Sequence, residues 1–216
     1  MVEPVINFMY ALTVFTAIFA IVDPMGNIPI FYTLTERFTR EERIKIAKKA
    51  VLAAATTLIV FGLIGDYIFI MFSITIPAFR IAGGMLLLRV AFNMLYGVTP
   101  GTKSTEKEKE ETLEKEMLGI VPLGIPLLAG PGAISTVMLF NSQGNIYNSL
   151  IVFISVLATL LITYVLLRNV DKIFSKLGRV GSLAISRIMG LILAAIAVQF
   201  IINGIHQIVI EWSAAL

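Results

Sequence analysis

Long apolar stretches dominate this sequence and restrict the chain to folds that belong in a lipid bilayer. There are six of them, at residues 8–35, 49–72, 77–97, 117–141, 149–168 and 183–206. A helix of about 20 apolar residues crosses the roughly 30 Å hydrocarbon core of a bilayer. Because lipid offers no hydrogen bonds to the backbone, spans of this length must be helical. The sequence therefore predicts an all-α membrane protein with six transmembrane helices.

Charged residues are scarce, and the basic ones gather in alternate loops. Only 14% of the 216 residues are charged, against about 25% in a soluble domain. Lysine and arginine occupy the first, third and fifth loops, residues 36–48, 98–116 and 169–182, whereas the other two loops and both termini have none. The positive-inside rule then places those three loops in the cytoplasm and both termini outside a multi-pass cell membrane, inner or plasma. Juxtamembrane charge explains the basic pI of 9.2, so no nucleic acid is expected as a partner.

A weak internal repeat divides the chain into two halves. Arg80-Ile-Ala-Gly83 returns 107 residues later as Arg187-Ile-Met-Gly190, and Pro24 and Pro131 have the same separation. Each half has three spans, and an odd number makes the second half enter the membrane from the opposite side. The predicted organisation is that of inverted repeats in alternating-access transporters: repeat 1 (residues 1–100), a charged cytoplasmic linker (101–116) and repeat 2 (117–216).

The first span of each half carries clustered proline and glycine, which predict a discontinuous helix in both halves. Span one contains Asp23-Pro-Met-Gly-Asn-Ile-Pro29, and span four contains Pro122, Pro126 and Ala129-Gly-Pro-Gly-Ala133. Proline removes a helical hydrogen bond, and glycine leaves the backbone uncovered. Bare backbone is costly in hydrocarbon, so the breaks should face protein or a wet cavity. They are interpreted either as a ligand site or as two packing kinks.

Helix ends at such breaks offer hydrogen-bonding groups to a small ligand. Free N–H groups suit a carboxylate, and free carbonyls suit an ammonium group or a cation. A small zwitterion fits both. The predicted substrate-binding residues are Asp23, Pro24, Met25, Gly26, Asn27, Ala129, Gly130, Pro131, Gly132, Ala133 and Thr136.

A structural role competes with binding at several of these positions. Asp23 either binds a substrate ammonium group or the coupling ion, or it caps the second half of its helix. Asn27 either binds substrate or satisfies the unwound backbone. Thr136 is expected to hydrogen-bond back onto its own helix. Arg80 and Arg187 are expected to anchor their helices near opposite faces, with gating as the alternative.

The two signature segments together resemble the MarC/SnatA family of membrane proteins. The likeness rests on Asp23-Pro-Met-Gly-Asn-Ile-Pro29 and Pro126-Leu-Leu-Ala-Gly-Pro-Gly-Ala-Ile134, with the six spans and the charged central loop, and it covers essentially the whole chain. It implies a secondary transporter that takes up small neutral amino acids such as glycine and alanine. It also implies a sodium or proton gradient as the driving force, with Na⁺ or H⁺ as the coupling ion and no other cofactor.

Other functions are weighed against this one. An exporter of drugs or amino acids would have the same architecture and differ in cavity size and direction. An intramembrane enzyme is disfavoured because the sequence lacks Gly-x-Ser-Gly, His-Glu-x-x-His and Gly-x-Gly-Asp, and it has no Walker A loop for ATP. The expected partners are a small neutral amino acid and the lipid bilayer. The sequence leaves a homo-oligomer open.

Overall fold

The chain folds into a bundle of long helices. The computed structural model describes residues 2–96, 117–142, 146–174 and 179–214, and these ranges contain helices and no strand. In chain order the elements are α1 (Val2–Val22), α2 (Pro24–Thr35), α3 (Arg40–Met71), α4 (Ile76–Tyr96), η1 (Gly119–Leu128), α6 (Pro131–Ser142), α7 (Ile146–Arg168), α8 (Val170–Phe174) and α9 (Arg179–Ala214). The predicted all-α class is confirmed for the described residues. The predicted linker at 101–116 lies outside them.

The predicted membrane spans have matching helices. Five are long and apolar enough to cross a bilayer: Phe8–Thr35, Arg40–Met71, Ile76–Tyr96, Ile146–Arg168 and Arg187–Ser213. A sixth span results if η1 and α6, which are bent by 57° at their junction, count as one. The protein is therefore a multi-pass integral membrane protein.

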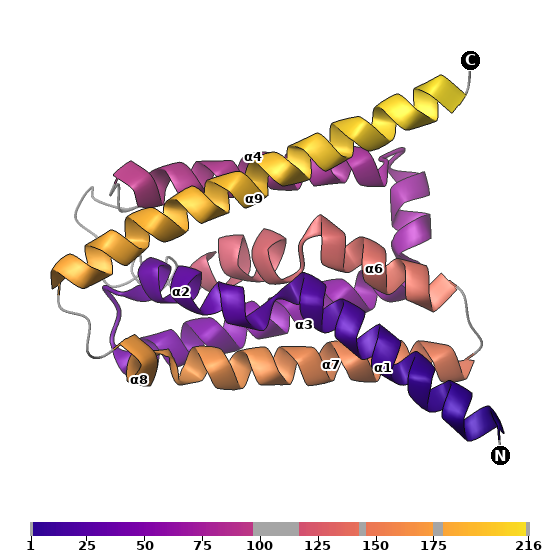
Figure 1. Ribbon diagram of the computed structural model, residues 1–216, viewed down its shortest axis with the longest axis horizontal. Helices are drawn as coiled ribbons and strands as arrows, with labels where there is room; N and C mark the ends of the chain where they lie inside the picture. The colour runs from indigo at the N-terminus through magenta and orange to yellow at the C-terminus, as the bar shows by residue number, and fades with distance from the viewer. Residues whose placement is uncertain (1, 97–116, 143–145, 175–178, 215–216) are drawn as a thin grey trace.

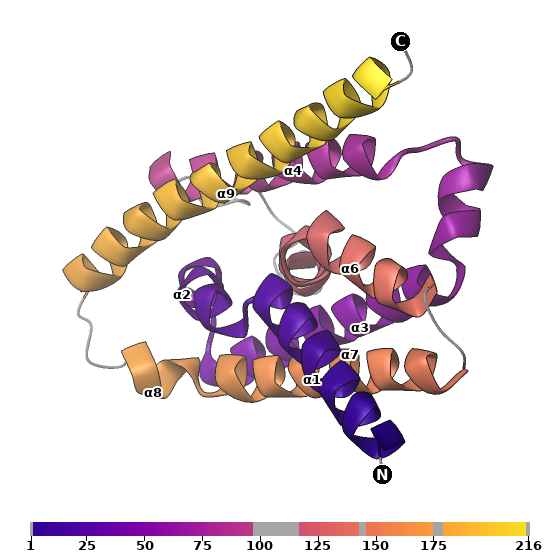
Figure 2. The same cartoon turned by 45° about the vertical axis from the view of Figure 1, so that its right-hand side comes forward.

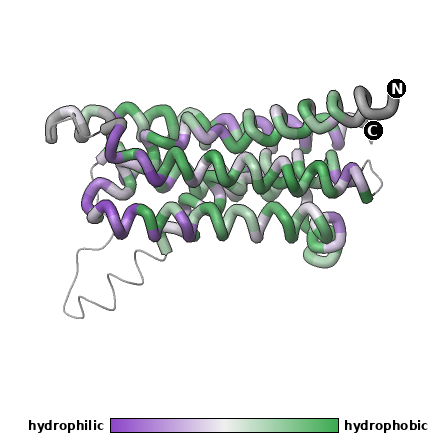
Figure 3. Tube along the Cα trace, turned by 90° about the horizontal axis from the view of Figure 1, so that it is seen from below, coloured by the Kyte–Doolittle hydropathy of each residue, from purple (hydrophilic) through white to green (hydrophobic). Residues whose placement is uncertain are grey.

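Both termini lie at the same end of the bundle, which agrees with six crossings when η1 and α6 count as one span. Figure 1 shows them at one end, and the α2–α3 connection, α8 and the start of α9 at the other. Along the bundle the middle is mostly hydrophobic, and hydrophilic residues are densest toward the end where α3 begins (Figure 3). Which end faces the cytoplasm stays a prediction of the positive-inside rule.

α3 begins at Arg40, ahead of the predicted residue 49, because a capping box starts it. The Thr39 hydroxyl accepts a hydrogen bond from the Glu42 N–H at 3.4 Å, and the Glu42 carboxylate accepts one from the Thr39 N–H at 2.9 Å. Two orphan donors of the helix N-terminus are thereby satisfied. Much of the basic first loop is thus a helical extension of the second span.

α4 and α9, the third long helix of each half, lie side by side (Figures 1 and 2). Glycine allows this close approach: a Cβ added to Gly84 would lie 2.7 Å from the Ala197 carbonyl oxygen. One added to Gly204 would lie 2.8 Å from the Pro77 carbonyl oxygen. Small residues that bring backbones together are the usual basis of helix packing in membranes.

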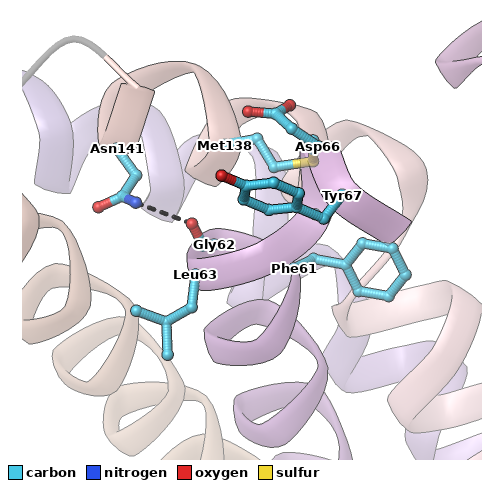
Figure 4. A pocket seen from close by; sticks show the side chains of 8 residues that line it. Phe61, Gly62, Leu63, Asp66, Tyr67, Met138 and Asn141 are labelled. Carbon is cyan, nitrogen blue, oxygen red and sulfur yellow. Dashed lines mark hydrogen bonds between the residues drawn. The ribbon is translucent and has the colours of Figure 1, made fainter. Parts of the chain in front are cut away.

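The second long helix of each half ends in a short segment with a new direction. α3 is kinked at Ile64, whose φ of −132° and ψ of 16° are not helical. Asn141 stabilises the kink, because its Nδ2 donates to the Gly62 carbonyl at 2.8 Å (Figure 4). α7 ends at Arg168, and α8 follows after Asn169. The final turns of α3 and the short α8 lie at opposite ends of the bundle (Figure 1).

Candidate functional site

The first predicted break is a single-residue interruption at Asp23. α1 ends at Val22, α2 begins at Pro24, and Asp23 between them has a left-handed φ of 47°. Aspartate tolerates this conformation because its short side chain can bond locally. Its carboxylate accepts a hydrogen bond from the Gly26 N–H at 3.0 Å, so it caps α2. The capping role considered for Asp23 is therefore present, and the side chain is also exposed.

Asn27 satisfies the backbone that this interruption frees. In an unbroken helix the Gly26 N–H would donate to the Val22 carbonyl. Here the Gly26 N–H donates to the Asp23 side chain, so the Val22 carbonyl needs another donor. Asn27 Nδ2 donates instead, at 2.7 Å to the Val22 oxygen and at 3.0 Å to the Asp23 oxygen. The side chain is only 6% exposed. Of the two roles considered for Asn27, the structural one is observed.

The second break is longer than the sequence indicated. Val121 and Ile125 have extended backbone angles, with φ near −130° and ψ near 120° (−130°, 122° and −134°, 125°). Each precedes a proline, whose ring disfavours the α conformation in the residue before it. The irregular path begins at Val121 and ends at Gly130, so Gly132 and Ala133 lie within α6 and not in the break.

α3 covers part of the irregular backbone of η1, as a bilayer environment favours. A Cβ added to Gly119 would lie 3.1 Å from the Ile46 carbonyl oxygen, and one added to Gly124 would lie 2.8 Å from the Ala53 Cβ. Both neighbours belong to α3. The absence of side chains at these two glycines therefore lets η1 lie directly on the backbone of α3.

The structure brings the two signature segments to one region. A Cβ added to Gly132 would lie 3.1 Å from the Ile21 side chain, which stands two residues before Asp23. Ala129 and Ala133 share a buried cluster with Val22. The start of α6 therefore packs against the end of α1.

Most of the predicted residues are covered in this conformation. Met25 is 59% exposed and Asp23 is exposed, and partial exposure remains at Gly26, Gly132 and Thr136. The others are buried: Pro24, Asn27, Ala129, Gly130, Pro131 and Ala133. A ligand in contact with all eleven would require α1 and α6 to separate.

Thr136 and its neighbour Ser135 bond back onto α6. Both hydroxyls donate to the Gly132 carbonyl, Thr136 at 2.8 Å and Ser135 at 3.0 Å. The expectation for Thr136 is confirmed. Both residues also line the cleft described next, so they connect the second break to that cleft.

This cleft of about 440 Å³ was not anticipated from the sequence. It lies where α3, α4, α6 and α9 meet, toward the end of the bundle with the termini, and its charged members are Asp66 and Arg80. Arg80 donates to the Gln207 side-chain oxygen at 3.1 Å and to the Ser135 hydroxyl at 3.4 Å. The sequence signal was weak: these residues come from four spans and share only a position near the outer ends.

A smaller cavity of about 60 Å³ adjoins the cleft at the α3 kink. Asp66 and Met138 line both spaces. Figure 4 shows Asp66, Tyr67 and Met138 around it, with Asn141 reaching the Gly62 carbonyl. The kink thus sets the position of Asp66 in the cleft.

At the opposite end, Arg43 joins three elements. Its Nε donates to the Thr35 carbonyl at 2.9 Å and its Nη2 to the Glu36 carbonyl at 2.8 Å, both at the end of α2. Its Nη1 forms an ion pair with Asp171 of α8, and the guanidinium lies 5.3 Å from the centre of the Tyr32 ring. A cation at a helix C-terminus also suits the helix dipole.

The described part of the chain has no cluster of side chains arranged as a metal site. No group of three or more His, Asp or Glu side chains there could hold a metal ion.

Known proteins resemble this chain over nearly its full length. It is 40% identical over 201 residues to a UPF0056 membrane protein of Methanocaldococcus jannaschii, covering 93% of this chain and 98% of that protein. It is 38% identical to the UPF0056 membrane protein YvbG of Bacillus subtilis, covering 92% and 95%. For the UPF0056 membrane protein YhcE of Escherichia coli the identity is 35%, covering 96% and 97%.

No solved structure matches the chain. The model of the MarC family of integral membrane proteins matches residues 8–209, a range that includes every membrane span except the last turn of α9. The whole bundle, with both signature segments, thus carries the family pattern. The chain belongs to the MarC family of integral membrane proteins.

Proposed function

We propose that this protein is a secondary transporter of small neutral amino acids such as glycine and alanine, driven by a Na⁺ or H⁺ gradient through alternating access. The observation that carries the proposal is the pair of interrupted first helices, one in each half, packed together where Gly132 contacts Ile21. Interrupted helices that meet are the usual substrate and ion site of such transporters.

The interruptions supply groups that suit a zwitterion and a cation. Pro24 and Pro29 have no N–H to donate to the carbonyls four residues earlier, those of Ala20 and Met25. Such carbonyls, with the exposed carboxylate of Asp23, are acceptors for an ammonium group or Na⁺. The start of α6 after Pro131 presents N–H groups to a carboxylate.

An inverted repeat is supported by a feature that the sequence did not reveal. The second helix of each half changes direction at a similar place: the α3 kink at Ile64 and Asn169, between α7 and α8, are 105 residues apart, close to the repeat offset of 107. Arg80 and Arg187 are separated by that offset. The two bends lie at opposite ends of the bundle (Figure 1), which supports the proposal that the halves run in opposite senses.

Alternating access is supported by the difference between the two ends. The end with the termini has the cleft of about 440 Å³. The other end is tied together by Arg43, which joins α2, α3 and α8. With the orientation that the positive-inside rule predicts, this form is open to the outside and closed to the cytoplasm.

Uptake into proteoliposomes tests the proposal. Labelled glycine and alanine are offered to purified protein under a Na⁺ gradient and, separately, a H⁺ gradient, with protein-free liposomes as the control. Saturable uptake that depends on one gradient is expected. Absence of uptake under both gradients, from protein shown to be folded, would exclude this importer and favour export or another solute.

A further inference from the structure

We propose that the cleft at the end with the termini is a recognition site for free amino acids, in which Arg80 binds the carboxylate and Asp66 binds the ammonium group. The proposal rests on the proposed function and adds a site outside the two signature segments. Substrate would be selected here before it reaches the helix interruptions.

Arg80 is the first reason. It belongs to α4 within a membrane span and is partly buried, yet both of its hydrogen-bond partners in the described residues, Gln207 and Ser135, are neutral. A cation inside a span is costly and is retained where it has a function. Each terminal nitrogen makes one such bond, so N–H donors remain for a ligand. A guanidinium binds a carboxylate through two parallel hydrogen bonds.

The position of Arg80 is fixed by a chain of hydrogen bonds. Gln207 Nε2 donates to Glu211 at 3.1 Å, which turns Gln207 Oε1 toward Arg80. Ser135 binds the guanidinium from the other helix and donates to the Gly132 carbonyl. Arg80 is therefore held between α6 and α9, ready to exchange a neutral partner for a charged one.

Asp66 provides the complementary charge. It lines the same cleft, and the α3 kink supported by Asn141 holds the segment that carries it. The rest of the wall combines the hydroxyls of Ser135 and Thr136 with the apolar Ile76, Met138 and Leu139. One cation, one anion and a short apolar wall match a zwitterion with a small side chain.

The site also leads to the second break. Ser135 contacts Arg80 and bonds to the carbonyl of Gly132, which itself packs on Ile21 beside Asp23. A carboxylate that displaces Ser135 from Arg80 acts directly on the first turn of α6. Binding in the cleft is thereby coupled to the region where the interrupted helices meet.

Three ligands test the roles of Arg80 and Asp66 separately. L-Alanine has both charges, propionate only the carboxylate, and alaninamide only the ammonium group. Binding to the full chain is measured by titration calorimetry in nanodiscs of zwitterionic lipid, so that no anionic headgroup competes for Arg80. Arg80→Lys is expected to weaken alanine and propionate by about tenfold or more, through loss of the paired hydrogen bonds, and to spare alaninamide. Asp66→Asn is expected to weaken alanine and alaninamide and to spare propionate.

Arg187→Gln is the matched control, because it removes a positive charge at the repeat-related position without touching the cleft. It should bind all three ligands as the wild type does. Arg80→Lys keeps the positive charge, so it tests the loss of the paired hydrogen bonds without removing the cation. Wild-type affinities in both the Arg80 and Asp66 variants, or no binding of any ligand by the folded wild type, would overturn the proposal.

Uptake assays on the same variants separate this proposal from the proposed function. Unchanged uptake and unchanged KM in Arg80→Lys and Asp66→Asn would exclude the proposed cleft site but would not contradict the proposed transport function. Binding that depends on Arg80, without uptake under either gradient, would support the cleft site and exclude the proposed transport function.

Discussion

At the scale of single residues, polar side chains near the first interruption mainly repair the backbone. Asp23 gives Gly26 an acceptor, and Asn27 then serves the carbonyls of Val22 and Asp23. The exchange confines the disturbance to one residue. It also leaves the Asp23 carboxylate exposed, with capacity for another partner.

Replacing Asn27 by alanine should destabilise the protein. The variant leaves the Val22 carbonyl without the side-chain donor that it has now, whereas the Asp23 carbonyl keeps the Asn27 backbone N–H at 3.2 Å. The expected cost is about 1–3 kcal/mol for a buried unpaired group. Thermal or denaturant unfolding in detergent measures the change. Asn169→Ala is the control, since its side chain makes the same kind of bond, to Val165, at an exposed site. Equal stability of the two variants would contradict the repair role.

Replacing Gly132 by leucine should stop transport in folded protein. Its added Cβ would lie 3.1 Å from Ile21, and the remaining side chain has to occupy the space between α1 and α6. Gly132→Ala should retain part of the uptake, because the Ile21 side chain can move by a few tenths of an ångström. Alanine uptake in proteoliposomes is measured for both, after gel filtration shows intact protein. Wild-type uptake by the leucine variant would refute the assignment of Gly132 to the transport path.

At the scale of elements, distortions of helices arise partly from the chain itself and partly from neighbours. Prolines at 122 and 126 distort η1 through the residue before each of them. The α3 kink has no proline. It depends on Asn141 of α6 and on the close packing of Gly65 against Met138, in line with the insertion of a side chain into the helical ladder.

Asn141→Ala should loosen the end of α3. Without the side-chain donor the Gly62 carbonyl loses this hydrogen bond, and the turns from Gly65 to Met71 lose a contact that sets their direction. Hydrogen–deuterium exchange should become faster in these turns than elsewhere in α3. Asn203→Ala, which removes an exposed bond to Gln199 within α9, is the control. Unchanged exchange would show that packing alone maintains the kink.

At the scale of the whole molecule, the two ends differ in a way that a transport cycle can use. The cleft opens at one end, and Arg43 joins α2, α3 and α8 at the other. These features lie at opposite sides of the packed interruptions. A cycle would exchange them, closing the cleft as the Arg43 contacts break.

Arg43→Ala should therefore shift the population toward a form open at the α8 end. The chain contains no cysteine, so single-cysteine probes report without further mutation. Thr35→Cys, now buried beside Arg43, should react faster with a maleimide in the Arg43→Ala background. Leu139→Cys in the cleft should react more slowly. Parallel changes at both probes would point to unfolding instead of exchange between two forms.

The same absence of cysteine allows the orientation to be tested. A membrane-impermeant maleimide applied to intact cells should label Ser213→Cys near the C-terminus and spare Glu41→Cys at the start of α3. Both positions are exposed, so access to the reagent decides the result. The reverse pattern would contradict the positive-inside assignment.

The sequence determined the features that depend on neighbours along the chain. Apolar length sets the spans, because the cost of leaving lipid adds residue by residue. Proline and glycine mark the segments in which the helical path is irregular, and the Thr136 hydroxyl bonds to its own helix, because these effects act within one turn. The second break extends back to Val121 because Pro122 and Pro126 disfavour the helical conformation in the residue before each of them.

Only the tertiary structure decided what depends on helices meeting in space. The cleft combines Asp66, Arg80, Ser135 and Gln207 from four helices, and the α3 kink uses a donor 79 residues away from its acceptor. Likewise, Arg43 forms an ion pair with Asp171, which is 128 residues away in the sequence. Local hydropathy cannot indicate which face of each helix turns toward which neighbour. That choice follows from the packing of small residues and glycines between helices, and it brings charges from separate spans into one cleft.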